Sequence, residues 1–336
     1  MAKSQIKEQA LYRDILRGAF EITWHRRELL GLGILASFLM MNGGAFEFIV
    51  RAIYKISAGN PYSGAPQFIK AIVDGIGSAE TTTQISVFLT AILLAGVFAL
   101  IAIVGVAASG GLFTASSRYA LKKKVTTREA FASGMNKLGP LLLTQIFGRI
   151  TIFAAFSLAA IGVYTQTGNP TASYVSIALF VAFAVTALFV SFVMAMTNAG
   201  IIIDKKRWVN AAHDALSFLH RHWLVSIEMI FMIFVIALIT AIAIGVAITI
   251  ALIPFTLILL AISALHFTGG ISALMFIFEL VVLAIIFAGS AALAVFGHTA
   301  WSILYIRLSN TGAVPKLERL WQMLKKARPH VRSRKF

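Results

Sequence analysis

Three charged residues fall inside long apolar stretches of this sequence, where a charge is costly in lipid and usually marks a function. They are Arg149, Glu228 and Glu279. Counting residues from the ends of these stretches places Arg149 and Glu279 near the middle of a hydrocarbon core that is about 30 Å thick. Glu228 falls only about one helical turn beyond a predicted span end, at the inner headgroups.

Arg149 and Glu279 leave three interpretations open. The two side chains could form a buried structural ion pair, belong to a path for a substrate or a proton, or never meet. An arginine near the midplane costs at least about 2.5–3.5 kcal/mol on insertion scales. We therefore expect Arg149 to be either paired or hydrated.

The histidines of residues 213–222 invite a metal-site hypothesis. His213, His220 and His222 lie near Asp214, but no His-x-x-x-His or Glu-x-x-His spacing occurs among them. Such spacing is what places two ligands on one face of a helix. We expect these side chains to contact the membrane interface, and we expect no bound metal or cofactor.

Hydroxyl groups gather at Thr114, Ser116 and Ser117, at the end of an apolar stretch. A catalytic hydroxyl needs a base beside it, and no histidine or carboxylate is suitably placed in the sequence. The hydroxyls are therefore interpreted as a polar span end. An enzymatic function ranks third, after the scaffold and transporter functions given below. The reason is that no convergent acid, base and nucleophile are visible, and no catalytic residue is assigned.

The composition is that of an integral membrane protein. Of the 336 residues, 59% are hydrophobic and only 12% are charged, against about 25% charged residues in soluble domains. The net charge is +16, but the basic residues flank the apolar stretches. The positive-inside bias of membrane proteins explains them without a nucleic-acid partner. Cysteine is absent, which excludes disulfides and thiol chemistry.

The apolar stretches predict an all-α, polytopic transmembrane bundle of six spans, because each exceeds the ~20 residues needed to cross the core. The predicted spans are Leu29–Val50, Ile85–Ala108, Leu141–Tyr164, Tyr174–Ile203, Leu224–Ile262 and Ile271–Ile306. Most cations lie before the first span, between spans two and three, between spans four and five, and after the sixth. This asymmetry predicts that both termini are cytoplasmic.

A basic turn and an amphipathic stretch, Asp204–Trp223, separate spans four and five. Trp208, Ala215 and Trp223 share one face at helical spacing, and Lys205–Arg207 precede it. This pattern is typical of a helix at the headgroup boundary in contact with anionic lipid. The alternative, which does not exclude the first, is a helix packed on other parts of the protein.

Weaker versions of this stretch precede spans one and three, at Leu11–Trp24 and Thr126–Leu138. Thr126 and Glu129 fit a capping box, and Gly139-Pro140 is expected to end that helix. A further surface helix is predicted at Lys316–Arg328 in the basic tail. The predicted lipid-interface residues are Trp24, Lys205, Lys206, Arg207, Trp208, Trp223 and Trp321.

The recurrence of these surface helices indicates one integral membrane domain, residues 1–336, built from three units. Each unit is a surface helix followed by an out-and-back pair of spans, at residues 8–109, 124–203 and 204–308, and residues 309–336 form a basic cytoplasmic tail. A repeat of this length suits either a transporter with internal pseudo-symmetry or a helical bundle enlarged by duplication.

The run Ala199–Lys206, followed by Asn210-Ala211-Ala212, Leu216 and His222-Trp223-Leu224, resembles a family of prokaryotic multi-pass proteins. That family includes the membrane domain attached to some glycerophosphodiester phosphodiesterases. The resemblance covers about 30 residues specifically and the rest diffusely. It implies a six-span helical fold, and it carries over no catalytic residue, because the phosphodiester chemistry of those proteins resides in a separate soluble domain.

Together these features predict a multi-pass protein of a prokaryotic plasma membrane that acts as a lipid-associated scaffold or as an accessory to another membrane component. The expected partners are anionic lipids, with a protein partner or a homo-oligomer as further possibilities. The alternative function is a small-solute or lipid transporter that uses Arg149, Glu228 and Glu279.

Overall fold

The computed structural model describes residues 11–37, 81–165, 172–264 and 268–311, and these residues form helices and no strand. Short helices alternate with long ones along the chain. The helices are α1 (Leu11–His25), α2 (Leu29–Ser37), α5 (Thr81–Ala120), α6 (Thr127–Asn136), α7 (Leu138–Thr165), α8 (Ala172–Ile203), α9 (Trp208–Arg221), α10 (Trp223–Ala264) and α11 (Thr268–Thr311).

Five of the described helices are long and apolar enough to cross a membrane. The candidate spans are Ala99–Ala120, Leu138–Gly162, Tyr174–Ile203, Trp223–Ile262 and Leu274–Ser309. An all-helical chain with several apolar helices, as predicted, is therefore confirmed. The rest of the first predicted span beyond Ser37, the predicted tail helix and Trp321 lie outside the described residues.

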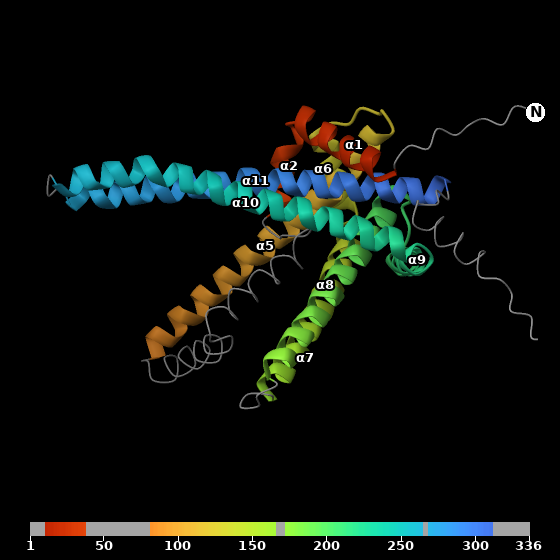
Figure 1. Cartoon of the computed structure of the whole chain (residues 1–336), viewed down its shortest axis with the longest axis horizontal. Helices are drawn as coiled ribbons and strands as arrows, with labels where there is room; N and C mark the ends of the chain where they lie inside the picture. The colour runs from red at the N-terminus through yellow and green to blue at the C-terminus, as the bar shows by residue number, and fades with distance from the viewer. Residues whose placement is uncertain (1–10, 38–80, 166–171, 265–267, 312–336) are drawn as a thin grey trace, which may run out of the picture.

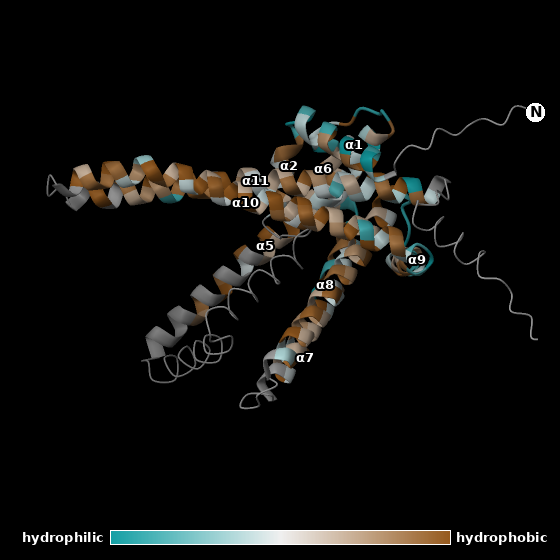
Figure 2. Cartoon of the chain, in the orientation of Figure 1, coloured by the Kyte–Doolittle hydropathy of each residue, from teal (hydrophilic) through white to brown (hydrophobic). Residues whose placement is uncertain are grey.

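Three arms extend from one region of the molecule in clearly different directions (Figure 1). One arm is the α7–α8 hairpin, the second is the α10–α11 hairpin, and the third is α5. Apolar residues predominate along the described parts of the arms, whereas hydrophilic residues gather where the arms meet (Figure 2). We call this meeting region the hub: it consists of α1, α2, α6 and α9 with the adjoining ends of the long helices.

The helices of the hub pack in an order that repeats three times. In each unit, a short helix and the helix after it both pack on the last helix of another unit. Thus α6 and α7 pack on α5, α9 and α10 pack on α8, and α1 and α2 pack on α11. Helices α5, α8 and α11 also contact one another. The third set of contacts joins the first unit to the last, so the three units form a closed ring.

Small residues let the short helices approach the long ones closely. A Cβ atom added at Gly134 of α6 would overlap the Ala107 carbonyl oxygen of α5 and would lie 2.8 Å from the Gly111 nitrogen. At the corresponding α8–α9 contact, a Cβ on Gly200 would lie 3.3 Å from that of Ala211. Backbone contacts this close require glycine or alanine at the crossing.

Two helix ends differ from the prediction. Helix α5 continues from the predicted span end at Ala108 to Ala120, because Gly110 and Gly111 pack against α6 and α7 rather than interrupting the helix. Pro140 does not end a helix but lies in the first turn of α7, which starts at Leu138. Proline is tolerated there because the first backbone N–H groups of a helix have no partner within it.

We predict that Gly134→Ala destabilises the protein by about 1–3 kcal/mol, because the added methyl group meets rigid backbone rather than a side chain. Unfolding in detergent, followed by circular dichroism, measures the change. Gly245→Ala in α10 is the matched control, since nothing lies within 4 Å of its Cβ position. Equal stability of the Gly134 variant and the wild type would show that this crossing is loosely packed.

Candidate functional site

Buried polar side chains concentrate where α5, α8 and α11 meet in the hub. The hydroxyl groups of Ser116 in α5 and Thr299 in α11 are 2.8 Å apart and hydrogen-bonded. The ring of Phe113 meets the His298 ring edge-on, with 4.9 Å between their centroids. Asn198 of α8 is also buried. A polar layer of this kind resists separation, because an unpaired buried polar group costs about 1–3 kcal/mol.

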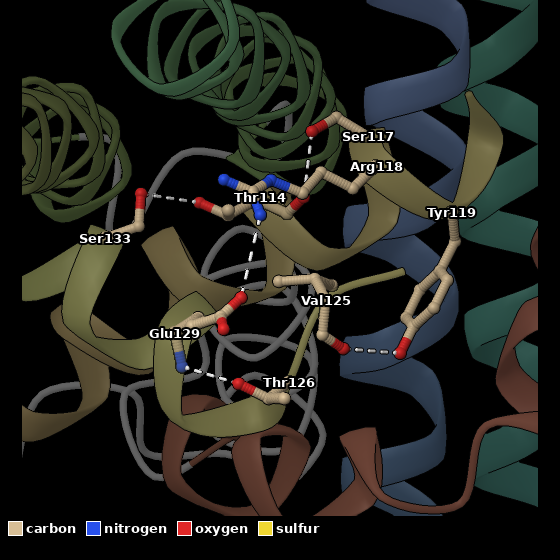
Figure 3. A network of polar contacts seen from close by, with 8 residues as sticks. All are labelled: Thr114, Ser117, Arg118, Tyr119, Val125, Thr126, Glu129 and Ser133. Atoms are coloured by element: carbon tan, nitrogen blue, oxygen red, sulfur yellow. Dashed lines mark hydrogen bonds and ion pairs between the residues drawn. The ribbon is translucent and has the colours of Figure 1, made fainter. Parts of the chain in front are cut away.

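The corner between α5 and α6 is held by contacts on both sides of the turn (Figure 3). The Thr126 hydroxyl accepts a hydrogen bond from the Glu129 backbone N–H at 3.3 Å, which confirms the Thr126 half of the predicted capping box. The Glu129 carboxylate is also 3.7 Å from the Arg118 guanidinium of α5. The Thr114 hydroxyl donates to that of Ser133 at 3.1 Å. The predicted polar span end therefore fastens α6 to α5.

The turn at the end of α5 contains three consecutive lysines in a fixed backbone conformation. Lys122 has a positive φ of 57°. Its N–H donates to the Tyr119 carbonyl at 2.9 Å, and the Lys123 N–H donates to the Arg118 carbonyl at 2.8 Å. These two bonds form a Schellman motif, in which glycine is the usual residue at the left-handed position. A lysine in its place keeps a positive charge at the tip of the turn.

A second corner joins α8, α9 and α11 through charged groups. The Tyr305 hydroxyl donates a 2.7 Å hydrogen bond to Asp204. The Lys206 ammonium lies 2.9 Å from the Asp204 carboxylate and 3.0 Å from that of Asp214 in α9. The bond to Asp204 raises the pKa of Lys206, burial lowers it, and the bond to Asp214 raises it further, so that the net shift is upward. Lys206 therefore stays charged and bridges the two carboxylates.

These arrangements clamp helices together, and they do not assemble a reactive centre. Within the described ranges, no three histidine, aspartate or glutamate side chains are placed to share a metal ion. The buried hydroxyls of the α5 end bond to backbone carbonyls and to other hydroxyls. The chemistry that this site supports is therefore the docking of short helices onto long ones.

The structure places the predicted intramembrane charges apart from one another. Arg149 lies on α7, Glu228 near the start of α10, and Glu279 on α11. Arg149 and Glu279 are both exposed, and they belong to arms that diverge (Figure 1). No ion pair joins these two side chains in the described part of the chain. Of the three open interpretations, the structure favours the one in which Arg149 and Glu279 do not meet.

The predicted lipid-interface residues have different surroundings. Trp24 and Trp223 are exposed, as are Lys205 and Arg207. Trp208 is partly buried and stacks on Phe147 of α7 with 5.1 Å between ring centroids. Lys206 forms ion pairs with two carboxylates, as described above. Lipid contact by these residues stays a prediction.

Sequence reasoning missed the role of Tyr305. Its partner Asp204 is 101 residues away in the chain, so no local spacing reveals the contact. The available signal was an aromatic hydroxyl near the basic end of an apolar span, which is a place where tyrosine often needs a polar partner.

Comparisons of this chain with protein-family models, with curated proteins and with solved structures find no match.

We predict that Tyr305→Phe destabilises the protein by about 1–2 kcal/mol, because it removes a hydrogen bond to a charged acceptor. A double-mutant cycle with Asp204→Asn, read by urea unfolding in detergent, separates this bond from the loss of the carboxylate. The Tyr305→Phe change should cost less in the Asp204→Asn background. Equal costs in both backgrounds would show that the hydroxyl does not bond to Asp204 in solution.

We predict that the destabilisations caused by Arg149→Ala and Glu279→Ala add to within about 0.5 kcal/mol in the double variant, as is usual for distant sites. The reason is their position on separate arms. Thermal unfolding of the four proteins in detergent measures the coupling. A double variant more stable than the sum of the single changes by over about 1 kcal/mol would instead show a direct pair.

Proposed function

We propose that this chain is a lipid-associated scaffold, or an accessory to another membrane component, in a prokaryotic plasma membrane. The observation that supports the proposal best is the combination of a closed ring of helices at the hub with three apolar arms that diverge from it. In the α10 candidate span, only 22% of the residues in the most apolar window are buried. Lipid or another membrane protein must cover the rest.

The exposed face of α10 carries a continuous apolar stripe suited to a partner helix. Its residues recur at intervals of three and four, which places them along one face of a helix. The stripe consists of Ile239, Ile242, Val246, Ile250, Ile253 and Leu257, each between 52% and 63% exposed. A transmembrane helix of a partner, or of a second copy, could lie along it.

The distribution of charge supports an orientation with the hub on the cytoplasmic side. Lys122, Lys123, Lys124, Lys205 and Arg207 all lie at hub ends of membrane helices and are exposed. Under the positive-inside bias, such residues stay in the cytoplasm and meet anionic headgroups. Both termini would then be cytoplasmic.

We predict that a photo-crosslinking amino acid placed singly at the six stripe positions in cells captures one membrane protein repeatedly. Mass spectrometry of the adducts identifies what is bound at each position. The matched control is position 244, because Ile244 packs on Gly289 of α11 and should give no adduct outside the chain. Adducts with lipid alone at every stripe position would overturn the scaffold role of this face.

The transporter alternative makes a different prediction about the arms. A scaffold should keep one distance between spin labels on two arms, for example at Leu158 of α7 and Ile250 of α10. The absence of native cysteine makes such labelling direct. Double electron–electron resonance spectroscopy of the labelled protein in nanodiscs measures the distribution of distances between the two labels. Two populations whose ratio changes with a solute would indicate alternating access and would contradict the proposal.

A further inference from the structure

A basic pocket lies between the end of α1 and the α5–α6 turn. Its volume is about 410 Å³. The residues that line it come from two segments of the chain that are about 90 residues apart. They are Glu21, Ile22, His25, Arg26, Tyr119, Lys122, Lys123 and Lys124.

The walls of the pocket are fixed before any ligand arrives. The Arg26 guanidinium stacks over the Tyr119 ring, 4.8 Å from its centroid. The Tyr119 hydroxyl is hydrogen-bonded to the Glu28 carboxylate at 2.8 Å and to the Val125 carbonyl at 3.0 Å. The Schellman motif fixes the backbone of Lys122, which also lines the pocket. Such preorganisation lowers the entropic cost of binding.

Positive charge is in excess in this pocket. Arg26 and the three lysines are cations at neutral pH, and the pocket contains one carboxylate, that of Glu21. The Glu21 carboxylate is 3.3 Å from the Arg17 guanidinium of the next helical turn. Four cations and one carboxylate thus line the pocket, and that carboxylate already has a cationic partner. A second carboxylate nearby, that of Glu28, is hydrogen-bonded to the Tyr119 hydroxyl, so the cations remain in excess.

The pocket lies where a lipid headgroup would be. Helix α5 ends at Ala120, just before the lysines, and α2 begins at Leu29, just after Arg26. Phe20 and Trp24 lie in α1, which ends just before Arg26. Their rings stack with 6.0 Å between centroids, and the two side chains are 60% and 64% exposed. Exposed aromatic side chains beside cations at the ends of membrane helices are typical of the interface.

We propose that this pocket binds the phosphate of an anionic phospholipid headgroup. Arg26 and the lysines bind the phosphate oxygens, and the Phe20–Trp24 pair contacts the upper acyl chains. This site deepens the lipid association of the proposed function and rests on it. It differs from the predicted contact at residues 205–207, where one of the two lysines is already paired with carboxylates.

Native mass spectrometry of the full-length protein in detergent tests the site, with phosphatidylglycerol and phosphatidylcholine titrated separately. The wild type should retain phosphatidylglycerol preferentially. The triple variant Lys122→Gln, Lys123→Gln, Lys124→Gln should bind it more weakly by roughly 100-fold, at about fivefold per lysine. A triple lysine-to-arginine variant should keep the affinity, because the site requires charge and not lysine itself.

The matched control removes three other hub cations by Arg13→Gln, Arg128→Gln and Lys137→Gln, none of which lines the pocket or belongs to the predicted lipid-interface residues. It should change the affinity by less than about fivefold. Equal losses in both triple variants would mean diffuse attraction and would overturn the site. Retention of phosphatidylglycerol by the pocket variant would also overturn it.

Full displacement of the lipid by millimolar inorganic phosphate would assign the pocket to soluble phosphate and contradict the lipid assignment. Circular dichroism must show that the pocket variant is folded, and the lysine-to-arginine variant provides a second check if it is not. The crosslinking scan on α10 does not involve this pocket. Loss of the site with intact α10 adducts would therefore overturn the pocket and leave the scaffold proposal standing.

Discussion

Close backbone contact between each short helix and the long helix beside it is the constraint on which the hub depends. At the α5–α6 crossing, Gly134 leaves no room for a Cβ atom next to Ala107 and Gly111. A Cβ on Gly18 of α1 would likewise lie 3.3 Å from Ile303 of α11. If these helices separated, the Thr114–Ser133 hydrogen bond could not form. The small residues at the crossings thus allow the close approach on which the polar contacts depend.

Lipid explains why the specific contacts gather in the hub. An apolar helix gains little by leaving lipid for another apolar helix, because both surroundings are equally apolar. In the described part of the arms, ring contacts join the two helices of a hairpin, as Phe156 with Phe183 and Phe255 with Phe278. The three arms can diverge because nothing in their composition requires them to pack together. The relative placement of the units rests on the hub.

Local patterns predicted much of the secondary structure. The length of the apolar runs indicated the long helices, and the Thr126–Glu129 spacing indicated the start of α6. Each of these signals is contained in one continuous stretch of sequence. The contact of α1 with α11 joins opposite ends of the chain and leaves no such signal. Pro140 was expected to end the preceding helix, but it lies in the first turn of α7, where proline is compatible with a helix.

Charge composition alone also cannot distinguish a paired cation from one that is available to a ligand. Asp204-Lys205-Lys206 and Lys122-Lys123-Lys124 both end a long helix, and Lys122 and Lys205 share a positive φ. The first turn contains its own carboxylate, and α9 brings Asp214 to the same ammonium. The second turn has no acidic residue, and α1 brings Arg26 to its wall. One corner of the ring thus pairs a lysine with two carboxylates, whereas the equivalent turn of another unit has three lysines and no carboxylate of its own. An architecture with a repeated packing order can therefore use one corner for structure, while the charge of another suits the anion site proposed above.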